Sequence, residues 1–267
     1  MKMKLYFTAI MFLGMIGVSN AQAQNPECMT NLSIFSEHAK VKNYDAAYEP
    51  FKKVYETCPQ LNNAIYVYGE RILKYKIDKA SAGEKDGFIK DLMGLYDDKM
   101  KYFSSKTNMA ETEIDKVLLQ YDNKMMDDSG VYAGLSKPFT EDKGNFKNPK
   151  ALYLYFSSLV DLHNAGKKEL QEVFDVYDDV TGKIEEENDK LTDRIAKLLP
   201  KEEEGTLTSK EKRQLKSYNS YSENYGKIAG YTDYLIICFF VNLAHRYPYD
   251  RTNRARISNS SFTRVVA

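Results

Sequence analysis

The spacing of the apolar residues after residue 24 constrains this chain more than any other feature. They recur at intervals of three and four, as in Leu92, Leu95, Tyr96, Met100 and Phe103, which places them on one face of an α-helix. No stretch after residue 24 sustains the alternation of apolar and polar residues that is typical of strands. The sequence therefore predicts an all-α protein. We expect helices over residues 29–42, 44–57, 61–77, 85–103, 110–127, 148–165, 168–199 and 208–228.

The breaks between the expected helices contain residues that end helices. Pro59, Gly83 and Gly166 lie in three of these breaks, and residues 130–149 are rich in Gly, Pro and Asp. Helices joined by such turns are typical of stacked hairpins rather than of a globular enzyme core. Residues 168–199 predict a long helix of about 45 Å, at about 1.5 Å per residue. It either packs within the chain or pairs with a second copy as a coiled coil.

The charge balance narrows the class of partner. The chain has 38 Lys and Arg residues and 38 Asp and Glu residues among its 267. A net charge near zero argues against a nucleic-acid binder, which needs a basic stripe or tail. With 43% hydrophobic residues the chain is apolar enough to bury a core. We therefore expect no nucleic-acid partner.

The first 23 residues have the pattern of a secretory signal peptide. Lys2 and Lys4 precede an apolar run over residues 5–18, and Ala21-Gln22-Ala23 supplies small residues for cleavage. The run is shorter than the ~20 apolar residues that a spanning helix needs. We therefore expect export of the mature chain to the periplasm or the extracellular space, with no transmembrane segment after cleavage.

Residues 28–61 carry the pattern of a paired-helix repeat. Ala47 is small enough to let two helices approach closely, Phe51 fills the wedge between them, and Pro59 stops the second helix. In its length of 34 residues and in these positions, the segment resembles a tetratricopeptide repeat. The same register places Tyr68-Gly69 on the Leu-Gly pair of a second repeat.

This resemblance, to secreted tetratricopeptide-repeat proteins of the Bacteroidota type, implies a helical-hairpin solenoid. It implies repeats over residues 24–130 and repeat-like hairpins over residues 131–230, around the long helix 168–199. Residues 231–267 are atypical, because Lys is absent after residue 227 while Arg becomes frequent. We expect poor order after about residue 245. The alternative is a terminal segment whose apolar run over residues 234–244 packs as a cap.

The resemblance also implies a partner-binding surface, since ligands of such repeats contact the concave side of the first helices. Carried over by position, the residues are Met29, Leu32, Ser36, Lys40, Asn63, Tyr66, Glu70 and Lys74. Tyr66, Glu70 and Lys74 lie four apart along one helix face. They combine an aromatic group with both signs of charge, which suits peptide capture. The alternative for Tyr66 is burial against the next helix pair.

The sequence carries no recognisable catalytic, cofactor or metal motif. His38, His163 and His245 are far apart, and phosphate-binding Gly loops and paired-cysteine zinc spacings are missing. We therefore expect a non-catalytic scaffold, without cofactor or metal, that binds protein or peptide partners. One alternative is a self-assembling envelope component with residues 168–199 as its association helix. Another is an envelope hydrolase whose site is built from scattered residues.

Two cysteines flank the first helix pair. Cys28 opens its first helix and Cys58 closes its second, and those ends lie side by side in an antiparallel hairpin. This geometry can bring the Cα atoms within the ~4.4–6.8 Å that a disulfide needs, and an oxidising compartment preserves the bond. We predict a Cys28–Cys58 disulfide. In the alternative, Cys28, Cys58 and Cys238 are all small buried hydrophobes.

Overall fold

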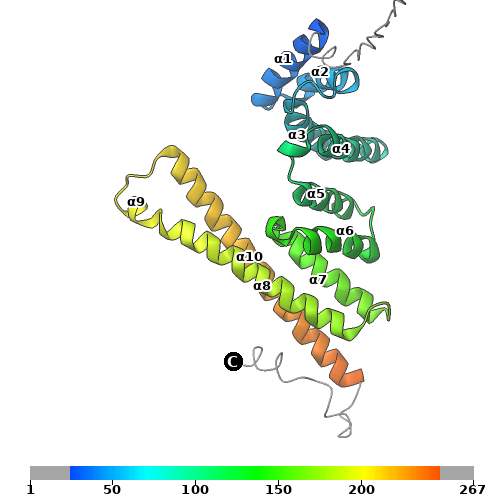
Figure 1. Cartoon of the computed structure of the whole chain (residues 1–267), viewed down its shortest axis with the longest axis vertical. Coiled ribbons are helices and arrows are strands. Elements are labelled where there is room, and N and C mark those ends of the chain that lie inside the picture. Colours follow the sequence, from blue (N-terminus) through cyan, green and yellow to red (C-terminus); the bar gives the residue numbers. More distant parts are fainter. Residues whose placement is uncertain (1–24, 247–267) are drawn as a thin grey trace, which may run out of the picture. The chain divides into compact units, whose positions relative to one another are not determined.

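A computed structural model describes residues 25–246, and every regular element in this range is a helix (Figure 1). The prediction of an all-α protein is confirmed for this part of the chain. The chain divides into two compact units, unit one ending at Thr107 and unit two beginning at Asn108. The expected signal peptide, residues 1–23, lies outside the described residues.

Unit one consists of two helical hairpins. Its helices are α1 (Pro26–Lys40), α2 (Tyr44–Thr57), α3 (Ala64–Lys79) and α4 (Ala82–Tyr102), followed by the short 3-10 helix η1 (Ser104–Lys106). Polar side chains fix where these helices begin. The Asn25 side chain accepts hydrogen bonds from the backbone N–H groups of Glu27 and Cys28, and Ser81 and Glu84 form a capping box at the start of α4.

The core of unit one is built on close approach at small residues. Ala47 of α2 and Gly69 of α3 are buried, and a Cβ atom added to Gly69 would lie 2.4 Å from Cε2 of Phe51. Phe51 is itself buried, and its ring packs edge-on against Phe35 of α1 at 5.9 Å between centroids. The packing expected for Ala47 and Phe51 is therefore observed.

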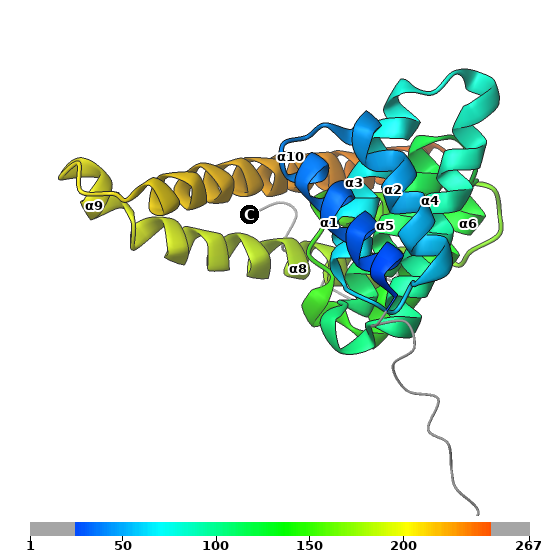
Figure 2. The same cartoon turned by 90° about the horizontal axis from the view of Figure 1, so that it is seen from above.

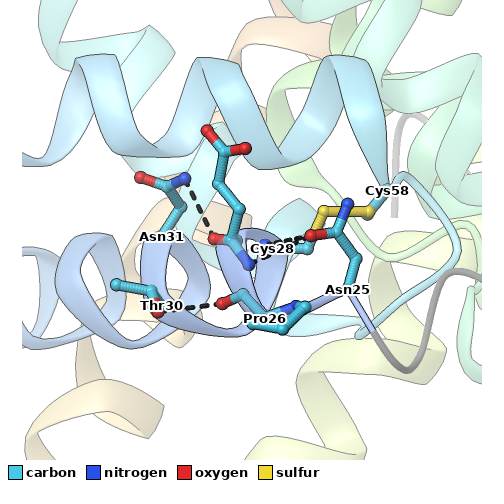
Figure 3. Close-up of a disulfide and its surroundings, with 7 residues drawn as sticks. Asn25, Pro26, Cys28, Thr30, Asn31 and Cys58 are labelled. Atoms are coloured by element: carbon cyan, nitrogen blue, oxygen red, sulfur yellow. Dashed lines mark hydrogen bonds between the residues drawn. A yellow bond between two sulfur atoms is a disulfide. The ribbon is translucent and has the colours of Figure 1, made fainter.

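The Cys28–Cys58 disulfide closes the first hairpin of unit one (Figure 3). The two Cα atoms lie 6.3 Å apart, although 30 positions separate the residues in sequence. Cys28 lies in the first turn of α1 and Cys58 caps the C-terminus of α2, and both are buried. The predicted pairing is confirmed.

Unit two holds a run of packed helices and a long hairpin. Its elements are α5 (Met109–Asp122), α6 (Asp128–Glu141), η2 (Lys143–Asn145), α7 (Pro149–Asn164), α8 (Leu170–Ala196), α9 (Leu199–Glu203) and α10 (Ser209–Arg246). Consecutive helices from α5 to α8 pack against one another, and α10 packs against both α7 and α8. Figure 1 and Figure 2 show α8 and α10 side by side, with α9 at the connection between them.

The long helix expected over residues 168–199 is present as α8, which ends at Ala196. Its apolar stripe includes Val173, Val180 and Ile184, all of which are buried in the core that α8 shares with α7 and α10. Helix α8 therefore packs within the chain, which is the first of the two arrangements that the sequence allowed.

Helix α6 occupies a stretch that the sequence suggested was a connection. Residues 130–149 were expected as a break, but α6 runs through Gly130, Gly134 and Pro138. The Asp127 side chain caps the helix by accepting a hydrogen bond from the Gly130 N–H. A Cβ atom at Gly134 would lie 2.6 Å from Cγ2 of Val117 in α5. Close packing, rather than a turn, therefore accounts for this glycine.

The expected boundaries after residues 130 and 230 also differ from the structure. The division lies between Thr107 and Asn108, because α5 and α6 pack with α7 in unit two. The second boundary falls inside α10, where Thr232, Ile236 and Phe239 are buried. The apolar run thus buries Ile236 and Phe239 in unit two, whereas its Tyr234, Ile237 and Val241 are exposed. Residues 247–267, to which most of the expected poor order refers, lie outside the described residues.

None of the helices between residues 25 and 246 combines the length and the apolar character needed to cross a bilayer.

Replacing Gly69 by Ala tests the close contact of α2 and α3. We expect a loss of about 1–2 kcal/mol in the free energy of unfolding, since the new methyl group must displace the packed Phe51 ring. Gly87→Ala in α4 is the matched control, because a Cβ there meets nothing within 4 Å, and it should gain about 0.5–1 kcal/mol. Urea unfolding followed by circular dichroism measures both. Equal stabilisation by the two substitutions would show that the contact is not tight.

The double substitution Cys28→Ala and Cys58→Ala tests the disulfide. Closing a loop of 30 positions restricts the unfolded chain, so its loss should cost about 3–4 kcal/mol. Denaturant titrations with and without reductant measure this cost. Reductant should lower the midpoint of the original chain and leave that of the double variant unchanged. A non-reduced digest without a linked Cys28–Cys58 peptide would contradict the pairing.

Candidate functional site

Unit one presents a surface at the contact of α1 with α3. Helix α1 packs against both α2 and α3. Because α1 and α3 are each the first helix of a hairpin, side chains of both hairpins lie on neighbouring parts of the surface. Lys40 of α1 is exposed and its Nζ lies 2.7 Å from Oε1 of Glu37. The hydrogen bond from Lys40 to Glu37 and the charge of that carboxylate raise the pKa of Lys40. Ser36, one turn earlier, is half-buried.

Tyr66 does not lie on this surface. Its side chain is fully buried, with its ring 6.0 Å from that of Tyr55 and 5.3 Å from that of Phe103 between centroids. Its hydroxyl donates a hydrogen bond of 3.0 Å to the carbonyl oxygen of Pro59, and burial raises its pKa. The expectation that Tyr66 contacts a partner is therefore wrong, because the ring is enclosed by α2 and by Phe103 at the end of α4.

The other expected residues of α3 are accessible in part. Lys74 is exposed and its Nζ pairs with Oε1 of Glu70 at 2.7 Å, so these two charges largely neutralise each other on one helix. Asn63 lies at the start of α3 and is half-buried, and its Oδ1 has no hydrogen-bond partner. The structure thus places Asn63, Glu70 and Lys74 along one side of α3 without the aromatic anchor that the sequence suggested.

Tyr68 and Arg71 supply an aromatic group and a cation that the sequence analysis missed. The Tyr68 ring packs edge-on against Phe35 of α1 at 6.5 Å between centroids, and Cζ of Arg71 lies 5.5 Å from the Tyr68 centroid. We name Glu37, Lys40, Tyr68 and Arg71 the α1–α3 surface. The repeat register had assigned Tyr68 to a packing position. The spacing of three between Tyr68 and Arg71 was the signal that could have revealed the pair.

Unit two contains a cleft of about 330 Å³, lined by α5, the segment before α7, α8 and α10. We call it the unit-two cleft. One wall is a face of α10, where Tyr218, Tyr221 and Tyr225 follow one another at intervals of three and four. Tyr225 is buried and its hydroxyl donates a hydrogen bond to the carbonyl oxygen of Lys147. Tyr221 is 50% exposed, so its ring remains accessible.

Helix α8 contributes Glu187, Leu191 and Arg194 to the lining of the cleft. Oε1 of Glu187 accepts hydrogen bonds from Nζ of Lys183 at 2.7 Å and from Nζ of Lys190 at 2.8 Å. Burial would raise the pKa of Glu187, but these two lysines outweigh it and the pKa is lowered. Further along the helix, Cζ of Arg194 lies 5.7 Å from the centroid of the Tyr218 ring.

Three asparagines line the cleft. Asn108 and Asn148 cap α5 and α7, each with its Oδ1 accepting a backbone N–H bond. Their side-chain NH₂ groups remain as donors. The NH₂ group of Asn145 donates to Asp142 instead, which leaves its oxygen as an acceptor.

The residues that line the unit-two cleft can therefore offer hydrogen bonds and aromatic contacts to a bound molecule.

The histidines do not form a site. His163 lies outside the cleft, where its Nδ1 is 2.7 Å from the carbonyl oxygen of Lys168 and its ring packs on Phe239. His38 is half-buried on α1. Within residues 25–246, no group of three or more His, Cys, Asp or Glu side chains is placed to hold a metal ion.

The chain was compared with family models, with curated proteins and with solved structures, and none of them matches.

Replacing Glu187 by Gln removes the charge that holds Lys183 and Lys190. We expect a loss of about 1–3 kcal/mol at neutral pH, the range for hydrogen bonds to charged groups. Because the folded-state pKa of Glu187 is lowered, its contribution is complete above the unfolded pKa of about 4.3 and disappears as the pH falls through the folded value. The difference between the two proteins should therefore shrink as the pH is lowered from about 5 towards 2.

Glu223→Gln is the matched control, since its pair with Lys227 on α10 is exposed and should contribute at most about 0.5 kcal/mol. Denaturant unfolding over the pH series measures both variants. A loss for Glu187→Gln no larger than that of the control, or a loss that does not change with pH, would show that a charged Glu187 does not stabilise the fold through Lys183 and Lys190.

Proposed function

We propose that the chain is an exported, non-catalytic helical-repeat scaffold that binds protein or peptide partners through the α1–α3 surface. The observation that carries the proposal is the packing of α1 against both α2 and α3. In a stack of tetratricopeptide-like pairs, first helices adjoin in this way and together form a binding face. The close approach of Phe51 to Gly69 supports such a stack.

The chemistry of the α1–α3 surface suits a protein or peptide. Tyr and Arg are the residues that most often dominate binding energy at interfaces. Tyr68 is already held against Phe35, so little side-chain freedom is lost when a partner covers it. Lys40 and Arg71 outnumber the single carboxylate of Glu37. We therefore propose a partner segment that carries an acidic side chain beside an apolar one.

Export agrees with the cysteine chemistry. The Cys28–Cys58 disulfide persists in oxidising compartments such as the periplasm or the extracellular space. The signal-peptide pattern of residues 1–23 points to the same compartments.

Substitutions at the surface test this function. The tagged mature chain captures partners from an envelope extract of the source cells, and mass spectrometry quantifies them. Tyr68→Ala combined with Arg71→Glu should lower the recovery of a specific partner at least tenfold, about 1.4 kcal/mol, because both anchors are lost. Lys52→Glu on α2 is the control for a charge change at an exposed position and should leave recovery unchanged. The same partners in the same amounts with both variants would contradict the proposed surface.

A second candidate, self-assembly, is favoured by one observation. The outer face of α10 exposes Tyr231, Tyr234, Ile237 and Val241 at 57%, 66%, 48% and 52%. This face replaces α8 as the candidate association surface, because α8 buries its stripe within unit two. Light scattering of the same preparations over a dilution series separates the two functions, since a scaffold stays monomeric without its partner and a self-assembling component does not.

A further inference from the structure

The unit-two cleft lies outside the surface used by the proposed function and has features of a ligand site in its own right. Its volume of about 330 Å³ is at the small end of the range for small-molecule sites, about 300–1,000 Å³. Its walls come from elements that are distant in sequence, α5, α8 and α10. The ligand it fits is therefore about the size of a single ring with its substituents.

The aromatic wall offers a surface for an apolar face of the ligand. Tyr225 is fixed by burial and by its hydrogen bond to the Lys147 carbonyl, and Tyr218 is covered on one side by Arg194. Tyr221, half exposed on the same face of α10, leaves its ring available. A ring of C–H groups, such as one face of a pyranose, packs against such an aromatic surface.

The polar groups of the cleft alternate in their hydrogen-bonding role. Asn108 and Asn148 present NH₂ donors, whereas Asn145 presents an oxygen acceptor. Glu187 is only 7% exposed, and both of its lysine partners bind Oε1, so Oε2 is a further acceptor at the cleft. A hydroxyl group both donates and accepts, so a ligand with several hydroxyls can satisfy donors and acceptors together.

The charges of the cleft balance. The lining holds two basic residues, Arg194 and Lys147, and two further acidic residues, Glu111 and Asp115, while Glu187 is neutralised by its lysines. A ligand with a full charge would leave groups of its own sign beside it, at a cost in this partly enclosed space. The balance favours a neutral ligand.

We propose that the unit-two cleft binds one unit of a neutral saccharide, with its C–H face on Tyr221 and its hydroxyls on the asparagines and Glu187. A ligand of this size, held by one accessible ring and a few hydrogen bonds, should bind with a dissociation constant on the order of 1 mM.

Ligand-observed NMR and calorimetry on the full mature chain test this proposal with glucose, galactose, mannose and N-acetylglucosamine as probes. At least one should bind saturably, and Tyr221→Ala should weaken that binding at least tenfold. Tyr121→Ala on α5, an exposed tyrosine of the same unit that does not line the cleft, is the matched control and should bind as the original chain does. Circular dichroism checks that both variants keep their helices.

Three results would overturn the proposal. The first is the absence of saturable binding by all four sugars. The second is binding that Tyr221→Ala leaves unchanged, since the sugar then occupies another place. The third is binding of a charged probe, either sodium glucuronate or glucosamine hydrochloride, at least tenfold tighter than any of the neutral sugars, because the cleft then selects charge.

Discussion

Unit one depends on the distance between α2 and α3, which is set where the Phe51 ring meets the backbone of Gly69. A larger residue at position 69 would have to displace that ring. The Phe35 ring of α1 packs against the same Phe51 ring, so α1, α2 and α3 all make contact around Phe51. Because α1 is held there and by the Cys28–Cys58 disulfide, its side chains meet those of α3 at a defined place. The α1–α3 surface is a consequence of this packing.

Unit two combines an apolar core with a polar layer in its long hairpin. Lys183 and Glu187 are buried between apolar positions of α8, and the side chain of Asn188 accepts a hydrogen bond from Ser222 of α10. Buried polar groups contribute little net stability when paired, yet they penalise any register that leaves them unpaired. We interpret this layer as fixing the alignment of α8 with α10. The unit-two cleft lies where that layer meets the starts of α5 and α7.

The sequence was informative wherever the physical cause was local. The helical period predicted most helices, and the positions of Ala47, Phe51 and the cysteine pair predicted the first hairpin. The sequence was misleading where the same residue type can have either of two structural roles. Gly134 in α6 resembles a turn residue, but it provides room for Val117. Tyr66 has the spacing of an exposed anchor, but periodicity cannot tell which flank of α3 meets its neighbour.

By itself the sequence determined that the described chain is helical, that its first two helices form a disulfide-closed hairpin, and that one long helix lies in its second half. These features follow from residues near one another in the chain or from a single pairing. Only the tertiary structure decided that Tyr66 is fully buried and Tyr68 half-buried, that α10 continues through the apolar run, and that Tyr221, Asn145 and Glu187 line one cleft. Those outcomes depend on which helix faces pack together, and that choice is made by shape and by the burial of groups distant in sequence.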